Sequence, residues 1–299
     1  MSEIVNIKTI QALQRLAGAP PSEHPLFAIT RLEDIPQLPE GYPTKMSYDF
    51  YSVGLKRNLN GYVKYGRQSY DFQEGLLGFS APGQVVAYER DVTIGSTGWM
   101  LFFEAEMLSG HTLATSIHRF GFFNYEVNEA LHLSKKEEEA IESIFENIYA
   151  EYHQPIDRYS KSVVLSNFEL LLTYANRFYG RQFITRNDVN TSLLQRFDKE
   201  IRHWFKEESL IDTGIPAVTD LARALNVSAN YLSDALKTLT GKSTKEHIHF
   251  HVIEKAKQKL LATNKSIAEV AYELGFEYPQ YFSRLFKEKT GLTPKEFRE

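Results

Sequence analysis

The chain has 299 residues, of which 42% are hydrophobic and 24% are charged, which is typical of a globular protein with room for two domains. It has no cysteine, so disulfides and thiolate sites are excluded, and no run of about 18 apolar residues predicts a membrane span. The net charge is −4, with 17 basic and 23 acidic side chains in residues 1–189, and 17 and 15 in residues 190–299.

The start of the chain lacks a basic stretch followed by an apolar run, so no secretory signal is predicted. We therefore expect a cytoplasmic protein that does not contact membranes. The excess of basic over acidic groups after residue 190 is small. A basic face matters more for nucleic-acid binding than the net charge does.

About 125 residues at the N-terminus are rich in aromatic and β-branched segments that Gly, Pro and Asn interrupt. Short segments of this kind predict the strands of an antiparallel sandwich or barrel. The predicted strands are Leu26–Arg31, Ser47–Lys56, Gly61–Tyr65, Gly75–Ser80, Gln84–Tyr88 and Thr97–Phe103.

Two amphipathic helices are predicted next. Ser134 and Glu137 have the spacing of a capping box, and Pro155 stops the helix that they begin. The second helix covers roughly Tyr159–Tyr179, and Gly180 is placed to end it. Its apolar side chains recur at spacings of four and three, which makes one seam: Val164, Phe168, Leu171, Ala175 and Phe178. This seam packs on the chain's own barrel, forms an antiparallel dimer interface, or does both.

Residues 181–192 are polar and weakly periodic, which is typical of a linker. An internal repeat lies in the helical region that follows. Residues 221–227 align with residues 270–276 at an offset of 49, and residues 231–241 align with residues 281–291 at an offset of 50. The extra residue falls in a turn, so each copy predicts a helix, a tight turn and a helix.

The residues in the two turns fit this prediction. Asn226 and Gly275 stand where the backbone needs a left-handed conformation, which these residue types tolerate best. An uninterrupted helix is predicted between the copies, over Thr244–Ala262. Its 19 residues correspond to about 28 Å. Successive major grooves on one side of DNA are about 34 Å apart, so the helix has a suitable length to hold two units in adjacent grooves.

The segment SIAEVAYELGFEYPQYFSRLFKEKTGLTPKEFR resembles the signature of the AraC/XylS family of bacterial transcription regulators, and LARALNVSANYLSDALKTLTGKSTKEHI resembles it more loosely. This resemblance implies that both units bind adjacent major grooves of promoter DNA. GLLGFSAPGQVV and the two helices after it resemble the cupin-like effector-binding and dimerisation domain of many members.

The outward positions of the two recognition helices are the candidate DNA-binding residues. They are Asn230, Ser233, Asp234, Lys237, Gln280, Ser283, Arg284 and Lys287. The Arg284 guanidinium can hydrogen-bond both acceptors of a guanine, and the Gln280 amide can pair with an adenine. The two lysines lie late in their helices, so we expect them to contact the phosphate backbone. Asp234 would be repelled by phosphates, so we expect the second unit to read sequence more strongly than the first.

Two further patterns have an ordinary and a functional interpretation. Aromatic residues of the predicted strands either form barrel core or line an effector pocket: Tyr48, Phe50, Tyr65, Phe79, Tyr88 and Trp99. His247, His249 and His251 are solvated or interface residues, or less plausibly metal ligands or phosphate contacts. No metal site or cofactor is predicted, because the predicted strands lack the His pattern of catalytic cupins.

The predicted fold is α+β. A cupin-like antiparallel β-barrel (residues 1–130) and a helical dimerisation segment (131–180) precede the linker (181–192) and an all-α domain with two helix-turn-helix units (193–299). The expected function is an effector-controlled regulator that forms a homodimer and contacts RNA polymerase, more often an activator in this family. The alternatives are an effector-independent regulator and a cupin-type metalloenzyme carrying a DNA-binding module.

Overall fold

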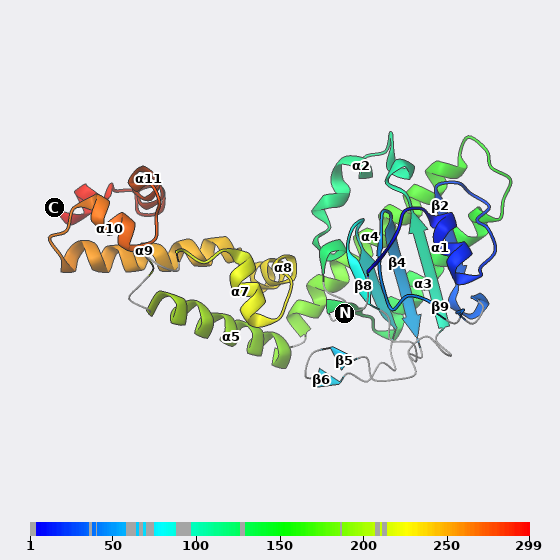
Figure 1. Cartoon of the computed structure of the whole chain (residues 1–299), viewed down its shortest axis with the longest axis horizontal. Coiled ribbons are helices and arrows are strands. Elements are labelled where there is room, and N and C mark those ends of the chain that lie inside the picture. The colour runs from blue at the N-terminus through cyan, green and yellow to red at the C-terminus, as the bar shows by residue number, and fades with distance from the viewer. Residues whose placement is uncertain are drawn as a thin grey trace. The chain divides into compact units, whose positions relative to one another are not determined.

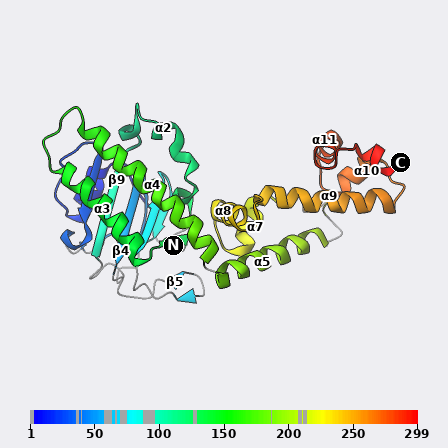
Figure 2. The same cartoon turned by 180° about the vertical axis from the view of Figure 1, so that it is seen from behind.

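The computed structural model describes residues 4–35, 38–39, 41–57, 64–65, 68–69, 75–87, 97–125, 129–185, 187–206, 210 and 214–299. The chain divides into two compact units, Met1–Gln182 and Phe183–Glu299. Figures 1 and 2 show the strands in the first unit and a wholly helical second unit. The fold is therefore a mixed α+β fold, as the sequence predicts.

The strands of the first unit are β1 (Val5–Ile7), β2 (Phe27–Arg31), β3 (Lys45–Tyr48), β4 (Tyr51–Arg57), β5 (Lys64–Tyr65), β6 (Gln68–Ser69), β7 (Leu76–Ser80), β8 (Val85–Ala87), β9 (Thr97–Phe103) and β10 (Leu131–His132). The main sheet has five antiparallel strands in the order β10-β7-β4-β9-β2. A smaller sheet has the order β1-β3-β8, and β5 pairs with β6. Among the strands that the structure describes, no closed barrel forms.

Two details correct the strand predictions. The predicted strand Ser47–Lys56 is two strands, because the chain passes from the small sheet to the main sheet at Asp49 and Phe50. At this crossing the Asp49 amide donates to the Ile7 carbonyl at 3.1 Å. In addition, β1 pairs with β3 in parallel, because α1 (Ile10–Ala17) and β2 lie between them and return the chain to the same end of the sheet.

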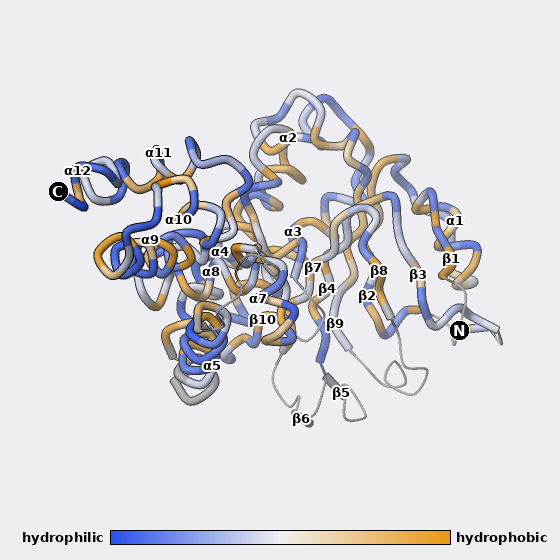
Figure 3. Tube along the Cα trace, turned by 60° about the vertical axis from the view of Figure 1, so that its left-hand side comes forward, coloured by the Kyte–Doolittle hydropathy of each residue, from blue (hydrophilic) through white to orange (hydrophobic). Residues whose placement is uncertain are grey.

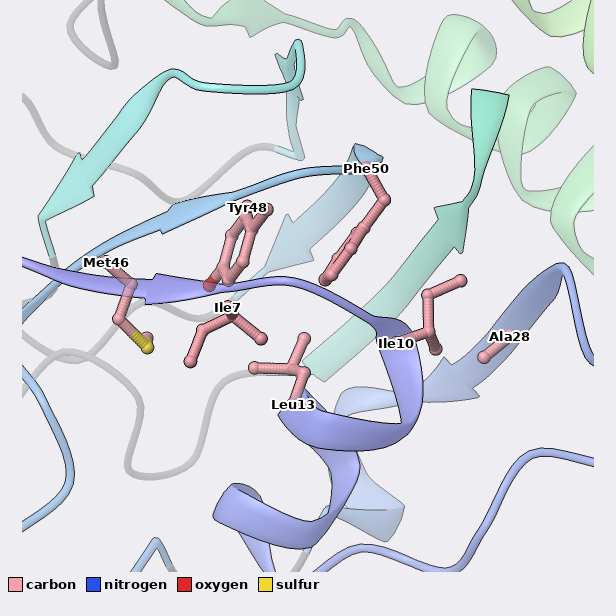
Figure 4. Packing of buried hydrophobic residues seen from close by; sticks show 7 residues of the cluster. All are labelled: Ile7, Ile10, Leu13, Ala28, Met46, Tyr48 and Phe50. Carbon is pink, nitrogen blue, oxygen red and sulfur yellow. The ribbon is translucent and has the colours of Figure 1, made fainter. Parts of the chain in front are cut away.

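A cluster of buried residues lies between α1 and the two sheets (Figure 4). Its members are Ile7, Ile10, Leu13, Ala28, Met46, Tyr48 and Phe50. The rings of Tyr48 and Phe50 are stacked with their centroids 5.1 Å apart. Tyr48 and Phe50 are two residues apart, a spacing that places both side chains on one side of an extended chain, and both are buried in this core.

The opposite face of the main sheet is covered by α3 (Lys135–Tyr152) and α4 (Ser160–Thr185), which cross in front of the strands in Figure 2. Short helical turns, among them α2 (Leu113–Ser116), fill the connection from β9 to β10. Trp99 of β9 stacks on Phe145 of α3 at 6.1 Å, and its indole nitrogen donates to Glu142 at 2.8 Å. The predicted capping box of Ser134 and Glu137 begins α3.

The apolar seam of α4 is buried in the chain's own core. All five residues are at most 7% exposed: Val164, Phe168, Leu171, Ala175 and Phe178. The Phe168 ring lies 4.5 Å from that of Phe103 on β9. Of the two interpretations of the seam, these contacts support packing on the sheet. The dimer interface predicted for these five positions stays a prediction, and their side chains are already covered within the chain itself.

Gly180 does not end α4, contrary to the sequence prediction. The helix continues to Thr185 because its next turn has partners in the first unit. Arg181 donates to Glu137 at 2.6 Å, and Gln182 accepts from the His132 amide at 2.8 Å. These contacts offset the cost of about 1 kcal/mol that a glycine adds inside a helix. The described residues of the predicted linker, 181–185 and 187–192, consequently lie in α4 and α5 (Asn187–Lys206).

The second unit begins with the last residues of α4. Its further helices are α5, α7 (Val218–Leu225), α8 (Ala229–Thr240), α9 (Thr244–Ala262), α10 (Ile267–Glu273), α11 (Pro279–Thr290) and α12 (Pro294–Arg298). Hydrophobic and hydrophilic residues alternate along these helices in Figure 3, as expected of helices with one buried face. In this part of the chain the bounds of α9 agree with the predicted ones. The sequence predicts the two recognition helices over about Ser228–Thr240 and Tyr278–Thr290, and α8 and α11 each start one residue later. No helix within the described ranges is long and apolar enough to cross a membrane.

Replacing Phe168 with Ala tests the role of the seam. We expect the N-terminal unit to lose about 3–5 kcal/mol of unfolding free energy, because a buried ring leaves a cavity. Urea unfolding followed by Trp99 fluorescence measures this loss once Trp204, the second of the two tryptophans, is replaced with Phe. Glu169 is exposed on the same helix, so Glu169→Ala is the control and should change stability by less than about 0.5 kcal/mol. Equal losses from both variants would contradict the packing described above.

Candidate nucleic-acid interface

The first helix-turn-helix unit consists of α7 and α8. Asn226 between them has φ of 56°, the one positive value among the described non-glycine residues. After this turn the Val227 amide donates to the Ala222 carbonyl at 3.1 Å, and the Ser228 hydroxyl accepts from the Tyr231 amide at 3.1 Å. The turn and the cap together fix the direction in which α8 leaves α7.

The second unit repeats this geometry in α10 and α11. Gly275 has φ of 81°, and the Phe276 amide donates to the Ala271 carbonyl at 3.0 Å. Pro279 occupies the first turn of α11, where its missing amide hydrogen removes no helical bond. Phe282 is fully buried, 5.4 Å from the Phe276 ring. The repeat seen in the sequence is therefore a repeat in three dimensions.

The helix α9 joins the two units. A capping box of Ser243 and Glu246 begins it, and its buried side chains include Ile248, Val252 and Ala256. Figure 1 shows α7 and α8 beside one end of α9, and α10 and α11 beside the other. The 19 residues of α9 give it a length of about 28 Å. One helix thus joins both units, and its length is of the same order as the groove repeat of DNA, about 34 Å.

The helix α5 belongs to this domain as well. Arg196 donates to the Leu225 carbonyl at the end of α7, at 2.5 Å, and Lys255 of α9 donates to the Phe205 carbonyl at the end of α5, at 2.8 Å. Cationic side chains at helix C-termini donate hydrogen bonds to the last carbonyl groups and interact favourably with the negative end of the helix dipole. The sequence prediction placed the domain start at residue 193, whereas α5 begins at Asn187.

The predicted contact residues of α8 differ in their environments. Asn230 and Lys237 are exposed. Ser233 is half-buried, and its hydroxyl lies 3.2 Å from that of Thr244 at the start of α9. Asp234 is also half-buried. This helix therefore presents an amide, a carboxylate and a late lysine, with its serine already hydrogen-bonded inside the domain.

The predicted contact residues of α11 form a more open face. Gln280, Arg284 and Lys287 are exposed, and Ser283 is half-buried. The structure adds a residue that the sequence prediction missed, Tyr281, which is 52% exposed. The guanidinium carbon of Arg284 lies 5.3 Å from the centre of the Tyr281 ring. A cation held over an aromatic face is a stabilising arrangement.

Tyr281 was missed because all the predicted contact residues are polar or charged, whereas Tyr281 is aromatic. Tyr231, at the equivalent position of α8, is 8% exposed and packs on Phe183 at 5.2 Å. The helical spacing was the available signal, since position 281 lies next to position 280 and one turn before Arg284. The two copies of the repeat thus differ at this position, which is buried in the first unit and exposed in the second.

The three histidines of α9 lie in separate environments. His247 is 2.9 Å from the Thr240 hydroxyl, and His251 stacks on Phe205 at 5.7 Å. Burial is the largest cause of a lowered pKa for all three, including His249. At pH 7 these imidazoles are therefore neutral, and they carry no charge toward phosphates.

The six aromatic residues of the predicted effector pocket do not form one group. Tyr48 and Phe50 lie in the core between the sheets, whereas Trp99 packs under α3 on the other face. Phe79 lies 4.4 Å from the Phe122 ring in the connection before β10. Tyr65 is in β5, although its surroundings, like all of Tyr88, lie outside the described residues. The main sheet thus separates Trp99 from the Tyr48 and Phe50 pair.

Comparison with known proteins gives a consistent result. Residues 221–299 match the family described as "Helix-turn-helix domain". An HTH-type transcriptional regulator of Bacillus subtilis, YfiF, is 25% identical over 84% of this chain and 77% of its own length. The xylose operon regulatory protein of Escherichia coli K12 is 30% identical over 32% of this chain, which spans 24% of that protein.

Among solved structures, the C-terminal domain of the two-component response regulator yesN from Fusobacterium nucleatum is 32% identical. It matches 34% of this chain and 97% of its own, with a TM-score of 0.31. Another curated relative, the transcriptional regulatory protein YesN of Bacillus subtilis, is 40% identical over 25% of this chain, which spans 21% of that protein. Several of these similarities are thus confined to the C-terminal domain.

Gly275→Ala tests the second turn. A Cβ atom at this position would lie 2.8 Å from the Leu210 carbonyl oxygen, and the alanine would have to keep the positive φ of this turn. We expect a loss of about 2 kcal/mol or more, measured by urea unfolding with Trp204 as the reporter in a Trp99→Phe background. Asn226→Gly is the matched control at the other turn and should be neutral or stabilising, because it relieves the left-handed strain. A neutral Gly275→Ala variant would contradict the close approach.

Proposed function

The chain belongs, through its C-terminal domain, to the AraC-type helix-turn-helix transcription regulators, and we propose that it binds promoter DNA with α8 and α11 under the control of a small-molecule effector. The observation that supports this proposal most is the pair of equivalent helix-turn-helix units on one long helix. In helix-turn-helix proteins the N-terminal part of the second helix contacts base edges in the major groove, and α8 and α11 are the second helices of the two units here.

Within this proposal the second unit discriminates between sequences. Arg284 is exposed on α11 and pairs with the two acceptors of a guanine, and Gln280, one turn earlier, reads adenine. Lys237 and Lys287 lie late in their helices and contact phosphates. Asn230, Ser233 and Asp234 contribute less, because Ser233 already bonds to Thr244 and Asp234 carries a negative charge.

The chain is a regulator and not an enzyme: a relative that aligns over 84% of it, including most of the N-terminal unit, is named a transcriptional regulator. A cupin-like N-terminal unit is supported by the two sheets and their apolar interior. We propose that the effector binds in this unit. We further propose that the protein forms a homodimer, acts in the cytoplasm as an activator and contacts RNA polymerase. The exposed side of α4, with Val163 and Leu170, replaces the buried seam as the dimer surface.

DNA binding is tested by selecting duplexes from a random pool with the full-length protein, followed by fluorescence anisotropy at low salt. We expect one enriched sequence. Arg284→Ala should then cost about 1–3 kcal/mol at a single guanine and abolish the preference there. Lys287→Ala is the matched control, expected to weaken binding to all sequences alike and to reduce the salt dependence. No enrichment at low salt would contradict the proposed function.

Effector binding is tested by thermal shift of the full chain against a panel of small metabolites, including sugars, organic acids and amino acids. A ligand of the folded N-terminal unit stabilises it by RT ln(1 + [L]/Kd), which is about 2.7 kcal/mol at a hundredfold excess over Kd. We expect one compound to raise the midpoint and to change the affinity for the selected duplex. If no compound of the panel raises the midpoint or changes the affinity for DNA, the result favours the effector-independent alternative.

A further inference from the structure

The first half of α11 and the residue before it carry an aromatic and cationic cluster. Tyr278, Tyr281 and Arg284 are spaced three residues apart, so they lie along one side of the helix. The rings of Tyr278 and Tyr281 meet edge to face with centroids 5.7 Å apart, and Arg284 lies over the Tyr281 ring at 5.3 Å. The tyrosines are 47% and 52% exposed. The cluster is therefore ordered by its own contacts and still accessible.

This cluster is not needed to fold a helix-turn-helix unit. In the first unit, the equivalent Tyr231 is buried against Phe183, and Asp234 stands where the second unit has Arg284. Both units nevertheless have the same turn and the same buried side of the recognition helix. The two exposed rings and the arginine form one contiguous group on α11 that packing does not require, and contiguous exposed groups of this kind mark interaction sites.

The position of the cluster suggests what it binds. The N-terminal residues of a recognition helix contact base edges in the major groove. There a guanine offers two acceptors to a guanidinium group, and a thymine offers a 5-methyl group to an apolar surface. Arg284 supplies the first partner, and the Tyr281 ring, in contact with it, supplies the second.

We propose that Tyr281 and Arg284 read two neighbouring base pairs as one unit, in which Arg284 pairs with a guanine and the Tyr281 ring contacts the 5-methyl group of the adjacent thymine. The contact between the two side chains restricts the guanidinium before DNA arrives, which lowers the cost of ordering it on binding. Tyr281 is thus a specificity-determining residue for the DNA binding on which this inference rests.

The test uses the full-length protein and the duplex selected above. Each thymine is replaced in turn with deoxyuridine, which lacks only the 5-methyl group. Removing one methyl contact is expected to weaken binding about three- to fivefold at the thymine next to the guanine. Tyr281→Ala should bind the thymine and deoxyuridine duplexes equally, whereas Tyr281→Phe should keep the difference, because it keeps the ring.

Two controls make the outcome specific. Tyr272 of α10 is 53% exposed outside the recognition helix, so Tyr272→Ala should retain the deoxyuridine effect and the wild-type affinity. Replacing the guanine with 7-deazaguanine removes the N7 acceptor and should weaken the wild type but not Arg284→Ala. Circular dichroism confirms that each variant is folded.

Three results would overturn the inference while leaving the proposed function intact. They are a selected site with no thymine beside the guanine, deoxyuridine duplexes that all bind as tightly as the thymine duplex, and a Tyr281→Phe variant that weakens all duplexes uniformly. The last result would mean that the Tyr281 hydroxyl contacts phosphate instead. Failure to select any sequence would, in contrast, contradict the proposed function itself.

Discussion

The C-terminal domain depends on one backbone constraint, the left-handed residue between the two helices of each unit. Asn226 and Gly275 turn the chain within a few residues, so that the next residue can donate to the end of the preceding helix. The turn sets the angle at which α8 and α11 leave their supporting helices. The buried faces of Leu232 and Phe282 then hold that angle. A recognition helix can present its outward side to DNA only because its inward side is fixed in this way.

The two units share this framework and differ on their surfaces. At equivalent positions, Tyr231 is part of the core and Tyr281 is open to solvent beside Arg284. The difference has a local cause, because Phe183 at the end of α4 covers the first tyrosine. A duplicated motif thus keeps its turn geometry and diverges where neighbouring segments of the chain cover only one copy.

The N-terminal unit is organised by its main sheet, which separates two apolar cores. One core lies between the sheets and contains Tyr48 and Phe50. The other lies under α3 and α4 and contains Trp99 and Phe168. Aromatic residues that were grouped by type therefore belong to different environments, and an effector would meet only part of them. The end of α4 is attached to the sheet through Gln182 and His132, which connects the last strand of that sheet to the helix leading out of the unit.

The sequence by itself predicted the features that depend on local chemistry. The capping box at Ser134 and the left-handed turns at Asn226 and Gly275 are confirmed, because each needs only residues that are near in sequence. The repeat located both recognition helices and the exposed face of α11 that includes Arg284.

Tertiary structure decided what depends on distant partners. It divided the predicted strand at Asp49, because the residues before it pair in the small sheet and the residues after it pair in the main sheet. It carried α4 past Gly180 because Glu137 and His132 provide partners for the next turn. It buried the α4 seam on the chain's own sheet and exposed Tyr281 while covering Tyr231. Spacing along a helix shows which residues share a face, but burial depends on which other segment meets that face.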